Sequence, residues 1–227
     1  MVGETFQNIF KQAKGRIIVA TFASNIHRVQ QIINAAVSYN RKVAVSGRSM
    51  VNVVDVATNL GYLNIPDGTL IDIGDINHYP ENKIVIITTG SQGEPMSALV
   101  RMSTSEHKQV DIIPGDMVII SANPIPGNEK LVYRVINQLF KRGADVIYKD
   151  LADVHVSGHA CQEELKLIHT LVKPKYFIPV HGEYRHLKQH ALLAQKLGMK
   201  EENIFLLDNG SVLEIDRKTA RVAGSVT

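Results

Sequence analysis

Cysteine and long apolar runs are nearly absent from this sequence of 227 residues. The only cysteine, Cys161, excludes an internal disulfide and favours a reducing compartment, so we expect a cytoplasmic protein. No apolar stretch approaches the length of a membrane span. Residues 1–5 also lack the basic and apolar pattern of a secretory signal. These absences argue against an exported or membrane-spanning protein.

The overall composition is that of a globular protein, with 44% hydrophobic and 21% charged residues. The length allows one large domain, or one medium domain with part of another. A net charge of +3 and a pI near 8.9 are compatible with a nucleic-acid partner but do not require one. Nine histidines are present, and their positions matter more than their number.

Short apolar runs alternate with helical patterns over the first two thirds of the chain. The pattern predicts strands at residues 16–22, 42–47, 83–88, 117–121 and 146–148. It predicts helices at residues 26–37, 51–60, 95–102 and 129–142. Strands that alternate with helices imply right-handed crossovers. The expected fold is therefore α/β, with a mostly parallel sheet flanked by helices.

Small and polar residues follow four of these strands, at residues 21–25, 46–49, 89–95 and 121–127. In parallel sheets such loops gather at one edge, where ligands commonly bind. Each loop leads into a helix start, whose free N–H groups favour anions such as phosphate. The same residues are also typical of ordinary strand-to-helix turns. The loops thus indicate an anion-binding rim without excluding a purely structural role.

The pattern changes after about residue 154. Helices are predicted at residues 162–172 and 184–197, and strands at 175–180, 204–207, 212–215 and 221–226. Asp208, Asn209 and Gly210 form a typical turn sequence. This part has α+β character and is too short to build a core easily on its own.

Two histidines stand at turns between predicted strands and helices. His181 follows the 175–180 run and precedes Gly182, a position that suits a metal ligand or a general acid or base. His159 lies between Gly158 and Ala160. Taken alone, each is also consistent with a capping or merely exposed histidine, because histidines outside a complete motif are seldom metal ligands. No complete metal motif of the His-x-His-x-Asp-His, Cys-x-x-Cys or His-Glu-x-x-His type is present.

Four ordered segments together resemble the bacterial ribonuclease J family, in the β-CASP group of metallo-β-lactamase-fold nucleases. They are residues 22–28 (FASNIHR), 90–95 (GSQGEP), 155–159 (HVSGH) and 179–185 (PVHGEYR). The resemblance covers essentially the whole chain. It implies a β-CASP domain at residues 1–160. It also implies that residues 161–227 are the C-terminal returning part of a metallo-β-lactamase domain.

The sequence departs from the family pattern in one large respect. Members of the family begin with half of a metallo-β-lactamase domain that carries His-x-His-x-Asp-His, a further histidine and a bridging aspartate, and none of these is present. We therefore expect the chain to be part of a longer protein and, in isolation, to be catalytically inactive.

The resemblance also implies roles for individual residues. His181 matches a histidine that ligates one ion of a two-zinc site, and His159 matches a catalytic histidine facing the scissile phosphate. Ser24 matches a helix-start position where a 5′-monophosphate is held. The residues implied to contact RNA are His155, Val156, Ser157, Gly158 and His159.

The implied function is part of a zinc-dependent ribonuclease with 5′-to-3′ exonuclease and endonuclease activity, acting in RNA decay and maturation. The expected partners are RNA, especially 5′-monophosphorylated RNA, and further copies of the chain or a paralogue, since unpaired strand edges favour association. A non-catalytic RNA-binding partner subunit is the alternative. A flavodoxin-like nucleotide- or flavin-binding domain is a third reading, but it leaves both histidine motifs unexplained.

Overall fold

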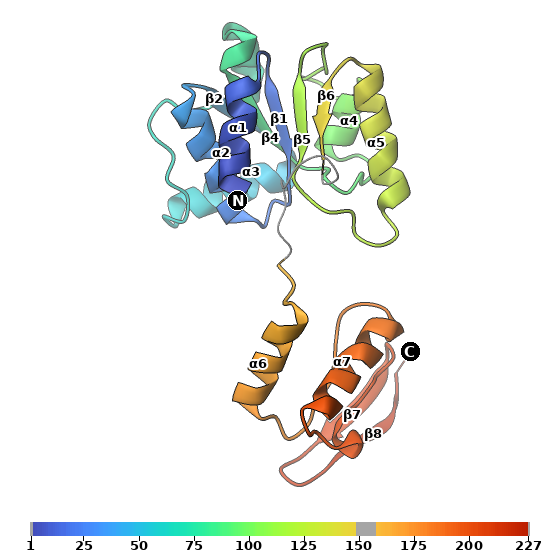
Figure 1. The fold of residues 1–227 in the computed structure, drawn as a ribbon. Coiled ribbons are helices and arrows are strands. Elements are labelled where there is room, and N and C mark those ends of the chain that lie inside the picture. The colour runs from blue at the N-terminus through green and yellow to red at the C-terminus, as the bar shows by residue number, and fades with distance from the viewer. Residues whose placement is uncertain (1, 149–157, 227) are drawn as a thin grey trace. The chain divides into compact units, whose positions relative to one another are not determined.

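The computed structural model of the chain describes residues 2–148 and 158–226 (Figure 1). The chain divides into two compact units, Met1–Ser157 and Gly158–Thr227. In the part that is described, the longest helices have 13 residues, and none is both long and apolar enough to cross a membrane.

The first unit is built on a six-stranded sheet with the order β3-β2-β4-β1-β5-β6. Its strands are β1 (Ile17–Ala20), β2 (Lys42–Ser46), β3 (Leu70–Ile71), β4 (Ile84–Thr88), β5 (Met117–Ile120) and β6 (Asp145–Ile147). Every neighbouring pair is parallel. The prediction of an α/β fold with a parallel sheet is confirmed.

Helices cover both faces of this sheet (Figure 1). They are α1 (Val2–Gln12), α2 (Ile26–Ser38), α3 (Arg48–Asn59), α4 (Ala98–Ser103) and α5 (Glu129–Lys141). Ile17 and Val19 of β1 pack with α1, α2 and α3, whereas Ile18 and Ala20 pack with α4 and α5. Because both faces are buried, the strands are almost continuously apolar.

Helix α1 and several short elements were not predicted. Val2, Phe6, Ile9 and Phe10 form the buried face of α1 at helical spacing. The other omissions are β3 and three 3₁₀ helices, η1 (Ile73–His78), η2 (Glu81–Lys83) and η3 (Glu201–Asn203). These elements are too short to carry a periodic pattern.

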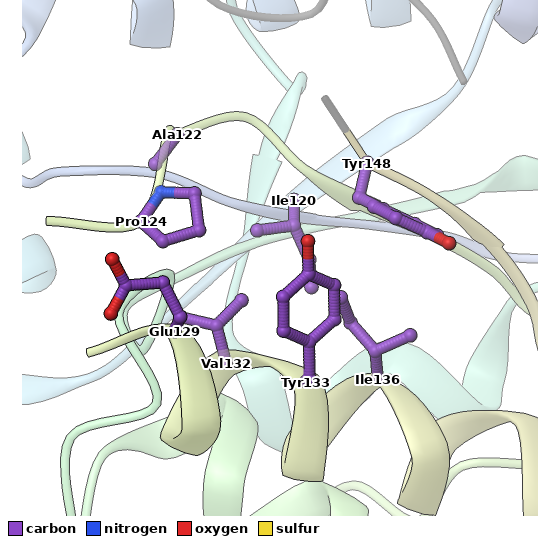
Figure 2. Close-up of a pocket in the computed structure, with 8 residues that line it drawn as sticks. All are labelled: Ile120, Ala122, Pro124, Glu129, Val132, Tyr133, Ile136 and Tyr148. Carbon is purple, nitrogen blue, oxygen red and sulfur yellow. The ribbon is translucent and has the colours of Figure 1, made fainter. Parts of the chain in front are cut away.

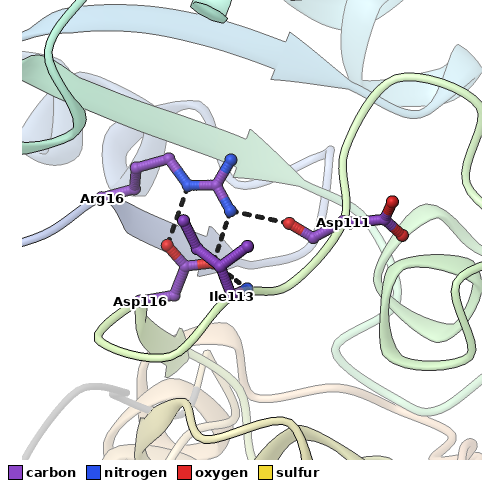
Figure 3. A network of polar contacts seen from close by, with 4 residues as sticks. All are labelled: Arg16, Asp111, Ile113 and Asp116. Atoms are coloured by element: carbon purple, nitrogen blue, oxygen red, sulfur yellow. Dashed lines mark hydrogen bonds and ion pairs between the residues drawn. The ribbon is translucent and has the colours of Figure 1, made fainter.

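A buried ion pair joins the segments that enter β1 and β5 (Figure 3). The guanidinium of Arg16 donates to both carboxylate oxygens of Asp116, at 2.8 and 2.6 Å, and to the carbonyl oxygen of Asp111 at 2.7 Å. The amide of Ile113 donates to the same carboxylate at 2.9 Å. The pair thus fixes the amino end of the sheet, away from the rim of loops.

The second unit contains α6 (Gln162–Val172), α7 (Tyr184–Lys196) and an antiparallel hairpin of β7 (Ser211–Ile215) and β8 (Ala220–Ser225). The predicted strands at 175–180 and 204–207 were wrong. These segments form only an isolated parallel bridge, in which Phe177 donates to Asn203 and accepts from Phe205, both at 2.9 Å. Apolar runs define extended segments, but a strand also needs a partner along its length.

Candidate functional site

The structure brings His159 and His181 together within the second unit. Their ring centroids lie 5.2 Å apart, and their ring planes differ by 16°, so the imidazoles are stacked. His159 lies just before α6, and His181 lies just before α7. Both residues are exposed. Two histidines that the sequence indicated separately therefore form one cluster.

Backbone conformation explains why the His181 imidazole projects from the chain. His181 has a φ of 73° and Gly182 a φ of 113°, so two successive residues adopt left-handed or related conformations. Among residues other than glycine, histidine is one of those enriched at positive φ. At Gly182, glycine is favoured by the positive φ and also by the lack of space for a side chain. A Cβ atom at Gly182 would lie 3.1 Å from His186. The sharp turn thus requires glycine directly after the histidine.

The start of α7 holds this turn in place. The amide of Glu183, the N-cap, donates to Nδ1 of His186 at 3.0 Å. The carboxylate of Glu183 lies 2.9 Å from Nε of Arg185, and both side chains are more than half exposed. The carboxylate is therefore an exposed helix-start charge paired with arginine, where the helix dipole favours it.

The described residues do not by themselves form a metal site. No group of three or more His, Cys, Asp or Glu side chains in residues 2–148 and 158–226 is arranged to hold an ion. A zinc site needs several nitrogen, sulfur or oxygen ligands at once. His181 offers one exposed imidazole, which by itself does not meet this requirement.

The remaining predicted site residues are placed as follows. Gly158 is exposed beside His159, whereas His155, Val156 and Ser157 lie outside the described residues. Ser24 is exposed in the turn before α2 and belongs to the first unit. The N-cap of α2 is Asn25, whose side chain accepts from the Arg28 amide at 3.0 Å.

The rim of loops forms where the parallel strands of the first unit end, and Gln92 ties two of these loops together. Its Nε2 donates to the carbonyl of Asn123 at 2.8 Å, and its Oε1 accepts from the amide of Ile125 at 2.7 Å. Gln92 is 2% exposed. Gly93 lies so close to α5 that an added Cβ would meet Leu131 at 2.7 Å. Much of the GSQGEP segment therefore has a structural explanation.

Arg28 is a buried cation that sequence reasoning missed. It is 5% exposed, donates to the Ser121 hydroxyl at 2.5 Å, and lies 5.9 Å from the Phe6 ring centroid. Burial lowers the pKa of Arg28. The sequence contained one sign of this burial: Arg28 lies four residues before Ile32, on the apolar face of α2. The contact joins α2 to the residue that follows β5.

A hollow of about 210 Å³ opens where β5 and β6 end (Figure 2). Tyr133 and Tyr148 meet there edge to face, with ring centroids 6.4 Å apart. Ile120 and Glu129 also line it, and the Glu129 carboxylate accepts from the Gly127 amide at 2.7 Å. Aromatic rings of this kind can stack on nucleobases.

Ser46 and His107 form a polar contact that cannot serve as a nucleophile and base. Oγ of Ser46 lies 3.0 Å from Nε2 of His107. Nδ1 of His107 accepts from the amides of Gln109 and Val110, at 3.3 and 3.1 Å. Nε2 therefore carries the proton and donates to Ser46. Burial lowers the pKa of His107, the charge of Arg101 lowers it further, and Asp111 opposes both.

Comparison with known proteins agrees with this architecture. The family described as "Ribonuclease J, beta-CASP domain" matches residues 14–139, which include most of the parallel sheet. The chain belongs to the ribonuclease J family. A second family, "Zn-dependent metallo-hydrolase RNA specificity domain", matches residues 143–207, which include His159 and His181. The resemblance inferred from the four sequence segments is thereby confirmed.

Individual ribonuclease J proteins are similar along nearly the whole chain. Ribonuclease J of Helicobacter pylori is 48% identical over 225 residues, covering 99% of this chain and 33% of that protein. Ribonuclease J of Synechocystis is 48% identical over 218 residues, covering 96% and 34%. Ribonuclease J2 of Bacillus subtilis is 45% identical over 214 residues, covering 94% and 38%. The chain spans roughly a third of the length of these curated relatives.

Proposed function

We propose that this chain is part of a zinc-dependent ribonuclease with 5′-to-3′ exonuclease and endonuclease activity, acting in RNA decay and maturation. Within that protein it supplies RNA and phosphate binding and one metal ligand. The observation that carries the proposal is the stacking of His159 on His181 at 5.2 Å, inside a segment that matches an RNA specificity domain of zinc-dependent hydrolases.

The two histidines have different roles in this proposal. His181, projecting from its positive-φ turn, donates one nitrogen ligand to an ion of a two-zinc site. When bound, the zinc ions supply a nucleophilic water and neutralise charge on the phosphate. His159 lies beside this ligand, so its imidazole can hold a proton at the scissile phosphate or give it to the leaving oxygen.

RNA recognition is divided between the two ends of the proposed β-CASP domain, residues 1–160. His155, Val156, Ser157 and Gly158 contact phosphates ahead of His159, where a glycine allows close backbone approach. Ser24, exposed one residue before the cap of α2, holds a 5′-monophosphate near the positive end of that helix. Residues 161–227 complete the metallo-β-lactamase part.

The isolated chain tests this division of labour directly. We expect it to bind single-stranded RNA with an affinity that falls steeply with salt, because phosphate contacts release counterions. We expect no hydrolysis of 5′-monophosphorylated RNA with added zinc or manganese, since one ligand is not a metal site. Filter binding and a gel-based cleavage assay measure both. Turnover that depends on His159 in this chain, or an absence of RNA binding, contradicts the proposal.

A further inference from the structure

Four cationic side chains surround a hollow of about 390 Å³ at the edge of the first unit where its parallel strands begin. Lys14 precedes β1, Arg41 directly precedes β2, and Lys83 directly precedes β4. These three strands are neighbours in the sheet, so the segments that enter them lie side by side. Lys11, in the last turn of α1, completes the group, which we call the amino-edge basic site.

Aromatic and polar side chains line the hollow together with the cations. Phe10 and Tyr39 are among the lining residues, with ring centroids 6.4 Å apart, and the Tyr39 hydroxyl donates to the carbonyl of Gln7 at 3.0 Å. Lys14 and Asn82, which also line it, are exposed. Among the residues of the described chain that line this hollow, none is acidic.

Structural roles explain only two of the four cations of the amino-edge basic site, Arg41 and Lys11. Arg41 is 5% exposed and donates to the carbonyls of Gly15 and Ala13, at 2.8 and 2.7 Å, so it ties β2 to the end of α1. Carbonyl oxygens satisfy its N–H groups without neutralising its charge. Burial accordingly lowers the pKa of Arg41. The negative end of a helix explains a lysine at the position of Lys11.

Lys14 and Lys83 have no comparable explanation. Lys14 lies beyond the end of α1, and Lys83 ends a single 3₁₀ turn. In the described part of the chain, no carboxylate lies within 4.0 Å of any of the four cations. A hollow lined by several unneutralised cations concentrates positive potential and attracts anions.

We propose that the amino-edge basic site binds phosphate groups of the RNA backbone, as a second contact at the opposite end of the sheet from the rim of loops. The choice of RNA rests on the proposed function. Cations from three separate segments suit an extended polyanion better than a single ion, and lysines bind phosphate as point charges without reading sequence. The site therefore adds affinity and salt dependence but no sequence preference.

The test is RNA binding by the full chain carrying Lys14→Glu and Lys83→Glu. The matched control carries Lys108→Glu and Lys141→Glu, two exposed lysines outside the hollow with the same total charge change. Fluorescence anisotropy with a labelled single-stranded RNA of about 20 nucleotides measures affinity from low to physiological salt. We expect the site variant to bind about tenfold more weakly, with a salt slope reduced by about 1.4, and the control to change less than about threefold.

The possible outcomes separate the two proposals. If the wild-type chain binds RNA and the two double variants lose the same amount of RNA affinity, only the total charge of the chain matters. That result contradicts RNA binding at the amino-edge basic site, while the proposed function stands. If the wild-type chain binds no RNA, the proposed function falls as well. Competition with uridine monophosphate identifies the ligand. If uridine monophosphate displaces labelled RNA from the wild type but not from the site variant, the site binds a mononucleotide. That result contradicts the proposal that the site binds an RNA strand. Unchanged circular dichroism spectra and melting temperatures confirm that the variants fold.

Discussion

The imidazole rings of His159 and His181 lie 5.2 Å apart and nearly parallel, although 21 residues that include all of α6 separate them in the sequence. Helix α6 carries the chain away from His159, and the segment after it returns to His181. The positive-φ turn at His181 and Gly182 then aims the second ring at the first. The cluster therefore depends on this turn.

Substituting Gly182 with alanine tests that dependence. Gly182 has a φ of 113°, and an added Cβ would lie 3.1 Å from His186, whose ring accepts the helix-capping hydrogen bond. The control is Gly198→Ala, at a φ of 94° with nothing within 4 Å of an added Cβ. Both changes cost about 1–2 kcal/mol for the left-handed backbone.

We expect Gly182→Ala to lose more stability than Gly198→Ala and, alone of the two, to shift the side-chain NMR signals of His181. Urea unfolding and histidine ring spectra measure these effects. Equal losses and unmoved His181 signals in both variants contradict the proposed role of the turn.

Asp116→Asn is expected to destabilise the chain by about 3–5 kcal/mol, because it leaves the buried guanidinium of Arg16 without its counter-ion. Glu214→Gln is the matched control. Its pair with Arg221 has a similar N–O distance, 2.9 Å, but both side chains are more than half exposed, so the loss is at most about 1 kcal/mol. Urea unfolding measures both. A loss at Asp116 no larger than that at Glu214 is incompatible with a buried pair that holds the sheet.

Gln92→Ala is expected to loosen the two loops that Gln92 joins. The substitution leaves the partly buried Asn123 carbonyl and Ile125 amide without their partner, at a cost of about 1 kcal/mol or more. Gln30 makes the same two-way contact with the backbone of Asn64 on the surface, so Gln30→Ala should cost much less. Hydrogen exchange of the Ile125 amide should accelerate in the first variant only. Unchanged exchange at that amide contradicts the proposed role of Gln92 in joining the two loops.

The stability of the first unit is expected to fall in mild acid because of His107. Burial and Arg101 lower its folded pKa, so the unfolded chain binds its proton more readily. The contribution is fully present above the unfolded value of about 6.5 and is lost as the pH falls from there toward the folded pKa. His107→Gln should remove this part of the dependence. Urea unfolding at pH 8, 7, 6 and 5 gives the difference between the two proteins, and a constant difference refutes the prediction.

The parallel sheet could be predicted because β1 and β4 are buried on both faces and are apolar except for Thr88 at the end of β4. Helix α1 was predictable too, since Phe6 and Phe10 recur at helical spacing, but β3 has only two residues and carries no pattern. The 175–180 run was misread because a strand requires hydrogen-bonded partners along its length, and the apolar character of the run does not specify them.

Part of the candidate site could likewise be predicted from the sequence and part could not. His159 and His181 were identifiable from their places at turns and from family motifs, but their stacking depends on the path of α6 and could not be read from either segment. Arg28 and Gln92 lie in two of the family segments, but their buried positions could not be predicted because a buried polar side chain is stable only with a tertiary partner. For both residues, that partner lies in the loop after β5.

We propose that His181 holds zinc while His159 acts on the phosphate. The most direct measurement is zinc content and RNA hydrolysis in a protein of full family length that contains this chain, with His78→Ala as an exposed-histidine control. We expect His181→Ala to lose both zinc and activity. We expect His159→Ala to keep its zinc and lose about 10²–10⁴-fold in turnover. Full zinc content in His181→Ala, or normal turnover in His159→Ala, would contradict the assignment.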